Sequence, residues 1–171
     1  MSLLRRLLGR PTSSNPPSSL AADSQGGEVT AEVVKQVREL LTQNAMTKAA
    51  KLLEALESGL RERPEVRLLQ GRYERLVGQT DQALATLDSL LAESDETAAI
   101  QMEMALCHLD LNDLPSAQDN LEVAVALQPT FGLAWLKLGT VLQRLDRRDA
   151  INALLRAVEC LNEPLELSDA W

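Results

Sequence analysis

Residues 105–139 decide the fold of this chain: ALCHLDLNDLPSAQDNLEVAVALQPTFGLAWLKLG. The stretch begins at Ala105 and ends at Gly139, 34 positions later, and Gly71 stands 34 positions before Ala105. Three further series recur at this spacing, with a final step of 33 positions in the Ala and Leu series. They are Asn44, Gly78, Asn112 and Asp146; Ala49, Ala83, Ala117 and Ala150; and Leu53, Leu87, Leu121 and Leu154. A period of this length indicates a repeat protein in which each unit is one supersecondary element.

The residue types in each series have a physical reason to recur. Asn, Asp and Gly tolerate the left-handed backbone that ends a helix, so the first series predicts a turn between two helices of each unit. Small residues on both helices allow an antiparallel pair to approach closely. The Leu series follows the Ala series by one helical turn and therefore shares its face.

Four units follow from this period, at residues 30–63, 64–97, 98–131 and 132–164, each a helix, a tight turn and a second helix. Pro64, Pro129 and Pro164 are placed to end second helices. The pattern resembles the tetratricopeptide repeat family. The fourth unit matches it best, with Trp135, Leu138, Gly139, Ala150, Leu154 and Ala157. The resemblance implies an all-α, right-handed solenoid of helical hairpins. In the first unit, Val37 stands where the family usually has a small residue.

Residues 1–29 are predicted to be a flexible leader, because PTSSNPPSSLAADSQGGEV at 11–29 is rich in Pro, Ser and Gly and offers little apolar surface to bury. The first ten residues, MSLLRRLLGR, combine leucines at helical spacing with three arginines. Three interpretations stay open: a start without fixed structure, a short helix that contacts a partner or, weakly, a membrane surface, and an organelle transit peptide. Residues 165–171 are predicted to be a short C-terminal tail.

The charge and composition exclude some classes of function. A net charge of −8 and a pI of about 4.7 argue against nucleic acid as a partner, because that affinity comes largely from neutralising phosphates. No stretch has the roughly 20 apolar residues that a membrane span needs. We therefore predict a cytoplasmic protein, with peripheral membrane contact only through residues 1–10. Cys107 and Cys160 are interpreted as small apolar side chains in a reducing compartment, with a disulfide as the alternative.

Catalytic chemistry is not expected. The only histidine, His108, is adjacent to Cys107, and neighbours on a helix point about 100° apart, so the two do not form a reactive pair. Metal-binding HExxH and CxxC patterns and phosphate-binding glycine loops are absent from the sequence. We predict that the protein is not an enzyme and that it holds no cofactor and no metal.

The resemblance implies that the first helices of the units line a concave groove that binds a segment of another protein. Carried over to this chain, the predicted apolar floor is Leu69, Met102, Leu106, Leu109 and Leu136, and the predicted basic residues are Lys35, Arg38, Arg72, Arg75 and Lys137. Arg38 and Arg72 are 34 positions apart, so we expect them to stack in a basic rim. The predicted partner is an apolar segment, or an apolar segment with acidic flanks.

The C-terminal end is a second candidate surface, because a solenoid needs a polar cap and only NEPLELSDAW follows at 162–171. Leu155, Val158, Leu161 and Trp171 are expected either to stay exposed and bind a partner or second copy, or to be covered when the tail folds back. The sequence thus predicts a non-enzymatic adaptor, assembly factor or chaperone-like protein that binds a client in its groove. The alternative is a scaffold that forms homo-oligomers through its C-terminal face.

Overall fold

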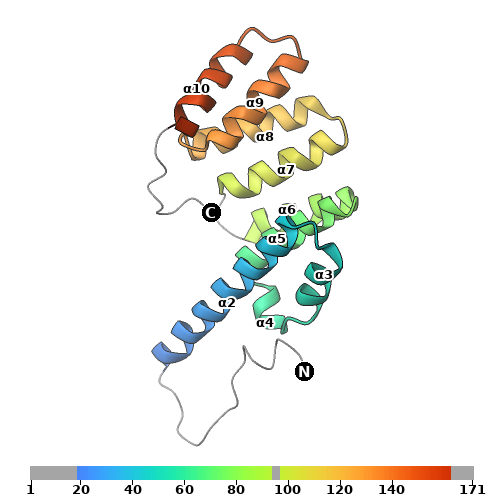
Figure 1. Cartoon of the computed structure of the whole chain (residues 1–171), viewed down its shortest axis with the longest axis vertical. Coiled ribbons are helices and arrows are strands. Elements are labelled where there is room, and N and C mark those ends of the chain that lie inside the picture. Colours follow the sequence, from blue (N-terminus) through green and yellow to red (C-terminus); the bar gives the residue numbers. More distant parts are fainter. Residues whose placement is uncertain (1–18, 94–96, 163–171) are drawn as a thin grey trace, which may run out of the picture. The chain divides into compact units, whose positions relative to one another are not determined.

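The computed structural model describes residues 19–93 and 97–162, with side chains from residue 29 onward, and within these ranges every regular element is a helix (Figure 1). The helices are α2 (Ser19–Thr42), α3 (Met46–Glu54), α4 (Ser58–Arg61), α5 (Pro64–Leu76), α6 (Thr80–Glu93), α7 (Ala98–Asp110), α8 (Leu114–Leu127), α9 (Gly132–Arg144) and α10 (Ala150–Asn162). Contacts divide the chain into two compact units, residues 1–73 and 74–171, with the boundary inside α5. We call these the first and the second unit, and we call the four units predicted from the sequence period repeats. The predicted all-α class of paired helices is confirmed.

The four predicted turn positions all have the left-handed backbone. The φ angles of Asn44, Gly78, Asn112 and Asp146 are 56°, 83°, 59° and 55°. In each turn the next residue donates its N–H to a carbonyl five residues back, over 2.8–2.9 Å: Ala45 to Leu40, Gln79 to Glu74, Asp113 to His108 and Arg147 to Leu142. This hydrogen bond is the mark of the Schellman motif, which ends a helix and satisfies its last carbonyls. The period of 34 therefore corresponds to one recurring turn.

The small-residue series lies where helices of a pair touch. Ala49, Ala83, Ala105, Ala117 and Ala150 are all buried. At Gly139 on α9, a Cβ would lie 2.6 Å from both Cγ and Cδ2 of Leu154 on α10. Since no real Cβ approaches another carbon so closely, α9 and α10 can pack at this distance only around a glycine.

The N-terminal boundary differs from the prediction. Residues 19–29 belong to α2, whereas their composition predicts a flexible leader up to residue 29. Ser19, Leu20, Ala21 and Ala22 suit a helix start, and once a helix is nucleated each added residue contributes one hydrogen bond. The helix continues through Gly26 and Gly27 although each costs about 1 kcal/mol relative to Ala. The rest of the leader, residues 1–18, and the tail at 165–171 lie outside the described residues.

The first repeat is less regular than the period predicts. Its second helix is interrupted: α3 ends at Glu54, and α4 covers only Ser58–Arg61. Arg61 donates from Nε to the carbonyl of Leu56 over 2.8 Å and from Nη2 to the carbonyl of Glu54, so its guanidinium satisfies carbonyls at the break. The core of the first unit, residues 1–73, includes the buried side chains of Val33, Val37, Leu41, Ala49, Leu53, Leu56, Val66 and Leu69.

The second unit is a regular stack in which α6, α7, α8, α9 and α10 each contact their neighbours in the chain. Its core comes from small residues together with Leu, Val and Met side chains, among them Met102, Leu121, Leu138 and Val141. Thr97 caps α7 by accepting from the N–H of Ile100, and Asp113 caps α8 by accepting from that of Ser116, both at 3.3 Å. These caps fix where each helix starts.

Candidate protein-binding surfaces

The first helices of the second unit, α7 and α9, carry the best-described part of the predicted groove. Leu106, Leu109 and Leu133 are partly buried and pack against one core, and Leu136 on α9 is 39% exposed. The C-terminal ends of α7 and α9 lie together, since Arg144 donates from Nη2 to Oδ1 of Asn112 over 2.6 Å. We call Leu106, Leu109, Leu133, Leu136 and Lys137 the α7–α9 face.

Leu69 and Met102 correct the predicted apolar floor. The exposed fractions of these side chains are 5% and 3%, and each belongs to the core of its own unit. Both occupy positions on first helices that the family pattern assigns to the groove. Leu69 shares one side of α5 with the buried Val66 and packs into the core of the first unit, and Met102 packs into the core of the second, so neither side chain is available to a partner in this conformation.

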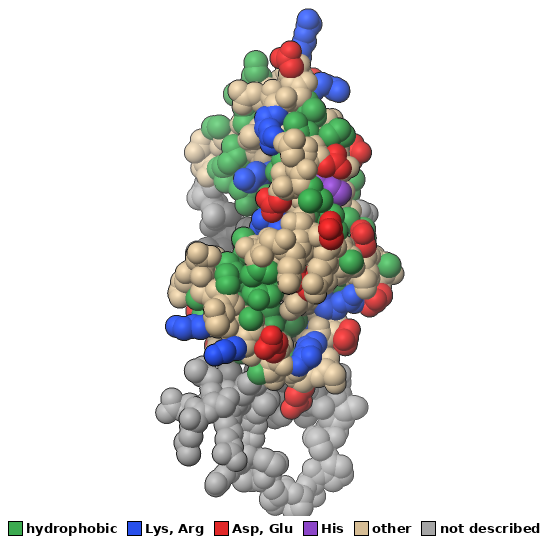
Figure 2. All heavy atoms as spheres, turned by 90° about the vertical axis from the view of Figure 1, so that its right-hand side faces the viewer, with side chains coloured by type: hydrophobic (Ala, Val, Ile, Leu, Met, Phe, Trp, Pro, Cys, Tyr) green, Lys and Arg blue, Asp and Glu red, His purple; other side chains and the backbone are tan. Residues whose placement is uncertain are grey.

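Arg75 corrects the predicted basic rim. Its Nε lies 3.4 Å from Oε2 of Glu103 and its Nη1 lies 3.1 Å from Oδ2 of Asp110, while its side chain is only 13% exposed. Two carboxylates on α7 thus neutralise the guanidinium. On the face shown in Figure 2, basic and acidic side chains are interspersed rather than separated into one basic area. The sequence pattern of Lys and Arg alone does not reveal such pairing.

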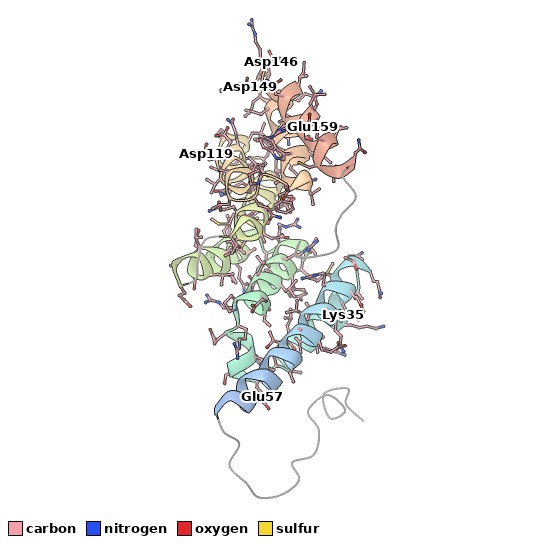
Figure 3. The ribbon with its side chains drawn as sticks, turned by 90° about the vertical axis from the view of Figure 1, so that its left-hand side faces the viewer. Lys35, Glu57, Asp119, Asp146, Asp149 and Glu159 are labelled. Carbon is pink, nitrogen blue, oxygen red and sulfur yellow. The ribbon has the colours of Figure 1, made fainter. Side chains whose placement is uncertain are left out.

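The basic residues of the first unit remain at or near its surface. Lys35 is exposed on α2, where Figure 3 labels it, and Arg38 and Arg72 are half-buried. Within the second unit, Lys137 on α9 is also half-buried and Arg144 is exposed. Lys35 and Arg144 are thus exposed cations, whereas the charge of Arg75 is neutralised.

Among the described residues, the large apolar side chains with the highest exposed fractions lie on α10. The exposed fractions are 68% for Ile151, 56% for Leu155, 54% for Val158 and 57% for Leu161. Their spacing of four, three and three residues places them along one side of the helix, and we call them the α10 stripe. The sequence prediction names Leu155, Val158 and Leu161 but misses Ile151, although the spacing would have found it. Trp171 lies outside the described residues.

A buried polar cluster in the second unit has no counterpart in the sequence prediction. Glu74 on α5 is 2% exposed and accepts hydrogen bonds from Thr86 Oγ1 at 2.8 Å and from Gln82 Nε2 at 3.1 Å. Both donors lie on α6, so the carboxylate fastens these two helices together. Hydrogen bonds of this kind offset the cost of burying a carboxylate.

The environment of Cys107 does not favour a reactive thiol. The side chain is fully buried on α7, and burial raises its pKa to about 12, against a smaller opposing effect of Arg75. His108 Nδ1 lies 3.5 Å from Oδ2 of Asp113. The pKa of Asp113 is lowered chiefly because this carboxylate accepts hydrogen bonds from Ser116. Cys107 is therefore protonated at neutral pH and inaccessible to a substrate.

Neither a cluster of metal ligands nor a membrane-spanning helix is present in the described residues. In residues 19–93 and 97–162 no three His, Cys, Asp or Glu side chains come together as metal ligands do. In the same ranges no helix has both the length and the apolar character needed to cross a membrane. The two described cysteines, Cys107 and Cys160, are not joined in a disulfide.

No protein-family model and no curated protein matches the chain. Solved structures do match it. MamA is 16% identical with a TM-score of 0.62, over 77% of this chain and 78% of that protein. Residues 41 to the end of MamA from Desulfovibrio magneticus RS-1 are 17% identical with a TM-score of 0.63, over 77% and 75% of the two chains.

Human IFIT1, solved as a dimer with PPP-AAAA, is 20% identical with a TM-score of 0.65. The match covers 84% of this chain but only 36% of IFIT1, so the chain spans about a third of that protein. At these identities the likeness shows a shared fold. It is consistent with helical repeats of the tetratricopeptide type.

Proposed function

We propose that this protein is a non-enzymatic interaction module, an adaptor, assembly factor or chaperone-like protein, that holds an apolar segment of a client protein against the α7–α9 face. The fold supports this proposal because helical repeats present extended binding surfaces on rigid elements. The structural likeness to MamA and IFIT1 supports the fold on which the proposal rests.

The exposure of Leu136 is the observation that carries the proposal. Leu136 is 39% exposed on α9, and three partly buried leucines of the same face, Leu106, Leu109 and Leu133, lie in contact with the core below. Complete burial of an exposed Leu is worth about 1.5–3 kcal/mol, so covering the rest of Leu136 would contribute about 1 kcal/mol. Rigid leucines at helical spacing suit an apolar helix or extended segment.

The ion pairs of Arg75 restrict the chemistry of the client. Because Glu103 and Asp110 already neutralise Arg75, an acidic flank on the client gains little there and meets two carboxylates on α7. Lys137 and Arg144 on α9 are the cations closest in sequence to Leu136 and offer a weaker attraction. We therefore propose a mainly apolar client segment whose acidic residues, where it has them, lie toward α9.

The absence of catalysis is part of the proposal. A nucleophilic role for Cys107 would require a thiolate near neutral pH, whereas burial raises its pKa to about 12. Turnover by the purified protein that disappears in Cys107→Ala or His108→Ala would contradict this part of the proposal. We propose that nucleic acid is not a partner on the net charge of −8 alone, and the likeness to IFIT1, which was solved with PPP-AAAA, does not support this part of the proposal. A cytoplasmic location, with membrane contact through residues 1–10, is proposed on the sequence alone.

The test compares the wild-type protein with Leu136→Glu in native pull-downs from the source cell, with partners identified by mass spectrometry. Val123→Glu is the matched control, because Val123 on α8 is 36% exposed, nearly as much as Leu136. We expect a specific partner that Val123→Glu retains and Leu136→Glu loses, with both variants folded by circular dichroism. A partner that binds Leu136→Glu as well as wild type would contradict the proposed site.

Self-assembly through the α10 stripe is a second candidate function. The four stripe residues are each more than half exposed, which leaves the last helix with an apolar side that nothing in the described chain covers. Exposed apolar surface of this continuity is characteristic of an interaction site. Leu155→Glu would abolish concentration-dependent association if this candidate is correct, and leave client capture through Leu136 intact.

A further inference from the structure

We propose that two copies of this chain pair through the α10 stripe as an antiparallel, two-fold symmetric dimer. The inference rests on the second candidate function, self-assembly, and names its partner and geometry. It is independent of the client site on the α7–α9 face. The occupant of the stripe is then α10 of a second copy.

The position of the stripe on its helix supports pairing with another helix. Successive residues turn by about 100°, so Ile151, Leu155 and Val158 lie within about 60° of one another around α10. Leu161 lies about 60° further round the helix than Val158, toward the buried side, and packs on Gly132 of α9 so closely that a Cβ there would lie 2.9 Å from its Cγ. Ala150, Ala153 and Ala157 on the opposite side are buried. Ile151, Leu155 and Val158 therefore form a straight apolar side of about two turns, which suits packing against another helix.

The charges beside the stripe identify the partner as a second copy. Arg156 and Glu159 are exposed and form an ion pair, with Nη1 and Oε2 2.9 Å apart. By the same 100° rotation both lie on one flank of the stripe, and Leu154 lies on the other. Figure 3 labels Glu159 on α10. The flank thus carries one positive and one negative charge, which are complementary to themselves after a two-fold rotation.

Only the antiparallel arrangement uses this complementarity. When two identical helices pack antiparallel, equivalent flanks face each other, so Arg156 of each copy approaches Glu159 of the other while Leu155 lies opposite Val158. A parallel pair would set the charged flank against Leu154. Antiparallel pairing also brings the exposed Arg147 and Arg148, which precede α10, toward the C-terminal end of the other α10, where the helix dipole favours cations.

Charge reversal tests this geometry directly. Sedimentation of the full chain at about 0.15 M salt, over protein concentrations from about 1 to about 500 µM, covers dissociation constants in the micromolar range. Arg156→Glu leaves two negative charges on the flank of each copy, and Glu159→Arg leaves two positive charges. We expect each variant alone to dimerise about tenfold more weakly than wild type. An equimolar mixture of the two should recover wild-type dimerisation, because both pairs across the interface then join opposite charges.

Two controls separate the interface from overall charge and from the client site. Asp119→Arg on α8 changes the net charge as much as Glu159→Arg does, and at about 0.15 M salt, where screening removes most of the repulsion between net charges, we expect it to leave the dimer unchanged. Leu155→Glu should give a monomer at every concentration, with a circular dichroism spectrum equal to wild type. The proposal is overturned if wild type stays monomeric throughout, as when residues 163–171 or a client cover the stripe, or if the mixture is no tighter than either variant alone. Client capture lost only in Leu136→Glu would survive either result.

Discussion

Gly139 shows how one residue sets the spacing of two helices. A Cβ at this position would lie 2.6 Å from two side-chain carbons of Leu154 and 3.2 Å from its backbone nitrogen. The side chain can rotate, but the backbone of α10 cannot yield without moving the helix. The repeat pattern shows only that a small residue is common at this position, whereas the contact with Leu154 requires that residue 139 be glycine.

We predict that Gly139→Ala lowers the free energy of unfolding by about 1–3 kcal/mol, the usual cost of overpacking a core. Chemical denaturation followed by circular dichroism measures this change. Gly59→Ala is the control, because nothing lies within 4 Å of a Cβ at Gly59 and its φ is not positive. That variant should be neutral or stabilising by up to about 1 kcal/mol, since Ala restricts the unfolded chain. Equal effects at the two glycines would show that α9 and α10 are not in close contact.

Cys107 makes the stability of the fold depend on pH in the alkaline range. Its pKa rises from about 9.0 to about 12 on folding, so the unfolded chain loses this proton at a lower pH than the folded one. The folded state is thus favoured fully below pH 9 and loses that advantage as pH rises toward 12. We predict that the free energy of unfolding falls over this interval in wild type and falls less in Cys107→Ala.

Thiol titration gives an independent reading of the same residue. Cys107 is fully buried while Cys160 is partly exposed, so one thiol should react readily in the native protein and the second only after denaturation. Rapid reaction of both thiols near neutral pH would show that α7 opens locally.

The turns are the elements that define the repeat, and Asp146 allows their role to be isolated. Its φ is 55°, and its side chain is exposed between α9 and α10. Asn112, in the equivalent turn, is less suitable because its side chain also accepts from Arg144. We predict that Asp146→Gly is neutral or stabilising, and that Asp146→Val costs about 1–2 kcal/mol because a β-branched residue is strained at positive φ. Thermal unfolding would measure both, and a tolerated valine would mean that the turn adopts another conformation.

Helix pairs could be predicted from the sequence because their signals are local. Asn44, Gly78, Asn112 and Asp146 report a backbone angle that few residues accept, and each one marks a Schellman turn in the structure. The 34-residue period did not predict the break between α3 and α4, because the break depends on how the guanidinium of Arg61 reaches two backbone carbonyls and not on residue type. The period also did not predict that the first helix begins at Ser19. The overall composition of residues 11–29 suggests a flexible segment, but a helix that forms after residue 29 can extend backward through residues 19–29.

The candidate site was predicted less well because exposure is a property of packing between elements. Leu69, Met102 and Leu136 all occupy first-helix positions that the repeat pattern treats alike, yet only Leu136 is exposed. The pairing of Arg75 with Glu103 and Asp110 spans 28 and 35 positions, and no local pattern contains it. Ile151, in contrast, was visible in the spacing along α10 and completes the stripe. Local geometry was thus predictable, and long-range pairing was not.

At the scale of the whole molecule, net charge opposes contact between copies. With a net charge of −8 on each chain, two copies about 30 Å apart in water repel by about 9 kcal/mol in the absence of salt. At an ionic strength of 0.15 M the screening length is about 8 Å, and most of that repulsion disappears. Association through the apolar stripe is therefore expected only where salt or protonation reduces the repulsion.

Salt affects the proposed dimer in two opposite ways, and their sizes decide the outcome. Screening weakens the pairs of Arg156 with Glu159 across the interface, but exposed pairs contribute only about 0–1 kcal/mol each. The repulsion that screening removes is several times larger, and salt does not weaken apolar contact. We predict that dimerisation strengthens between about 20 mM and about 200 mM salt, and again as the pH falls toward the pI of about 4.7. Sedimentation across both series would measure this, and an interface held together by charge would show the reverse, with dimers that dissociate as salt is added.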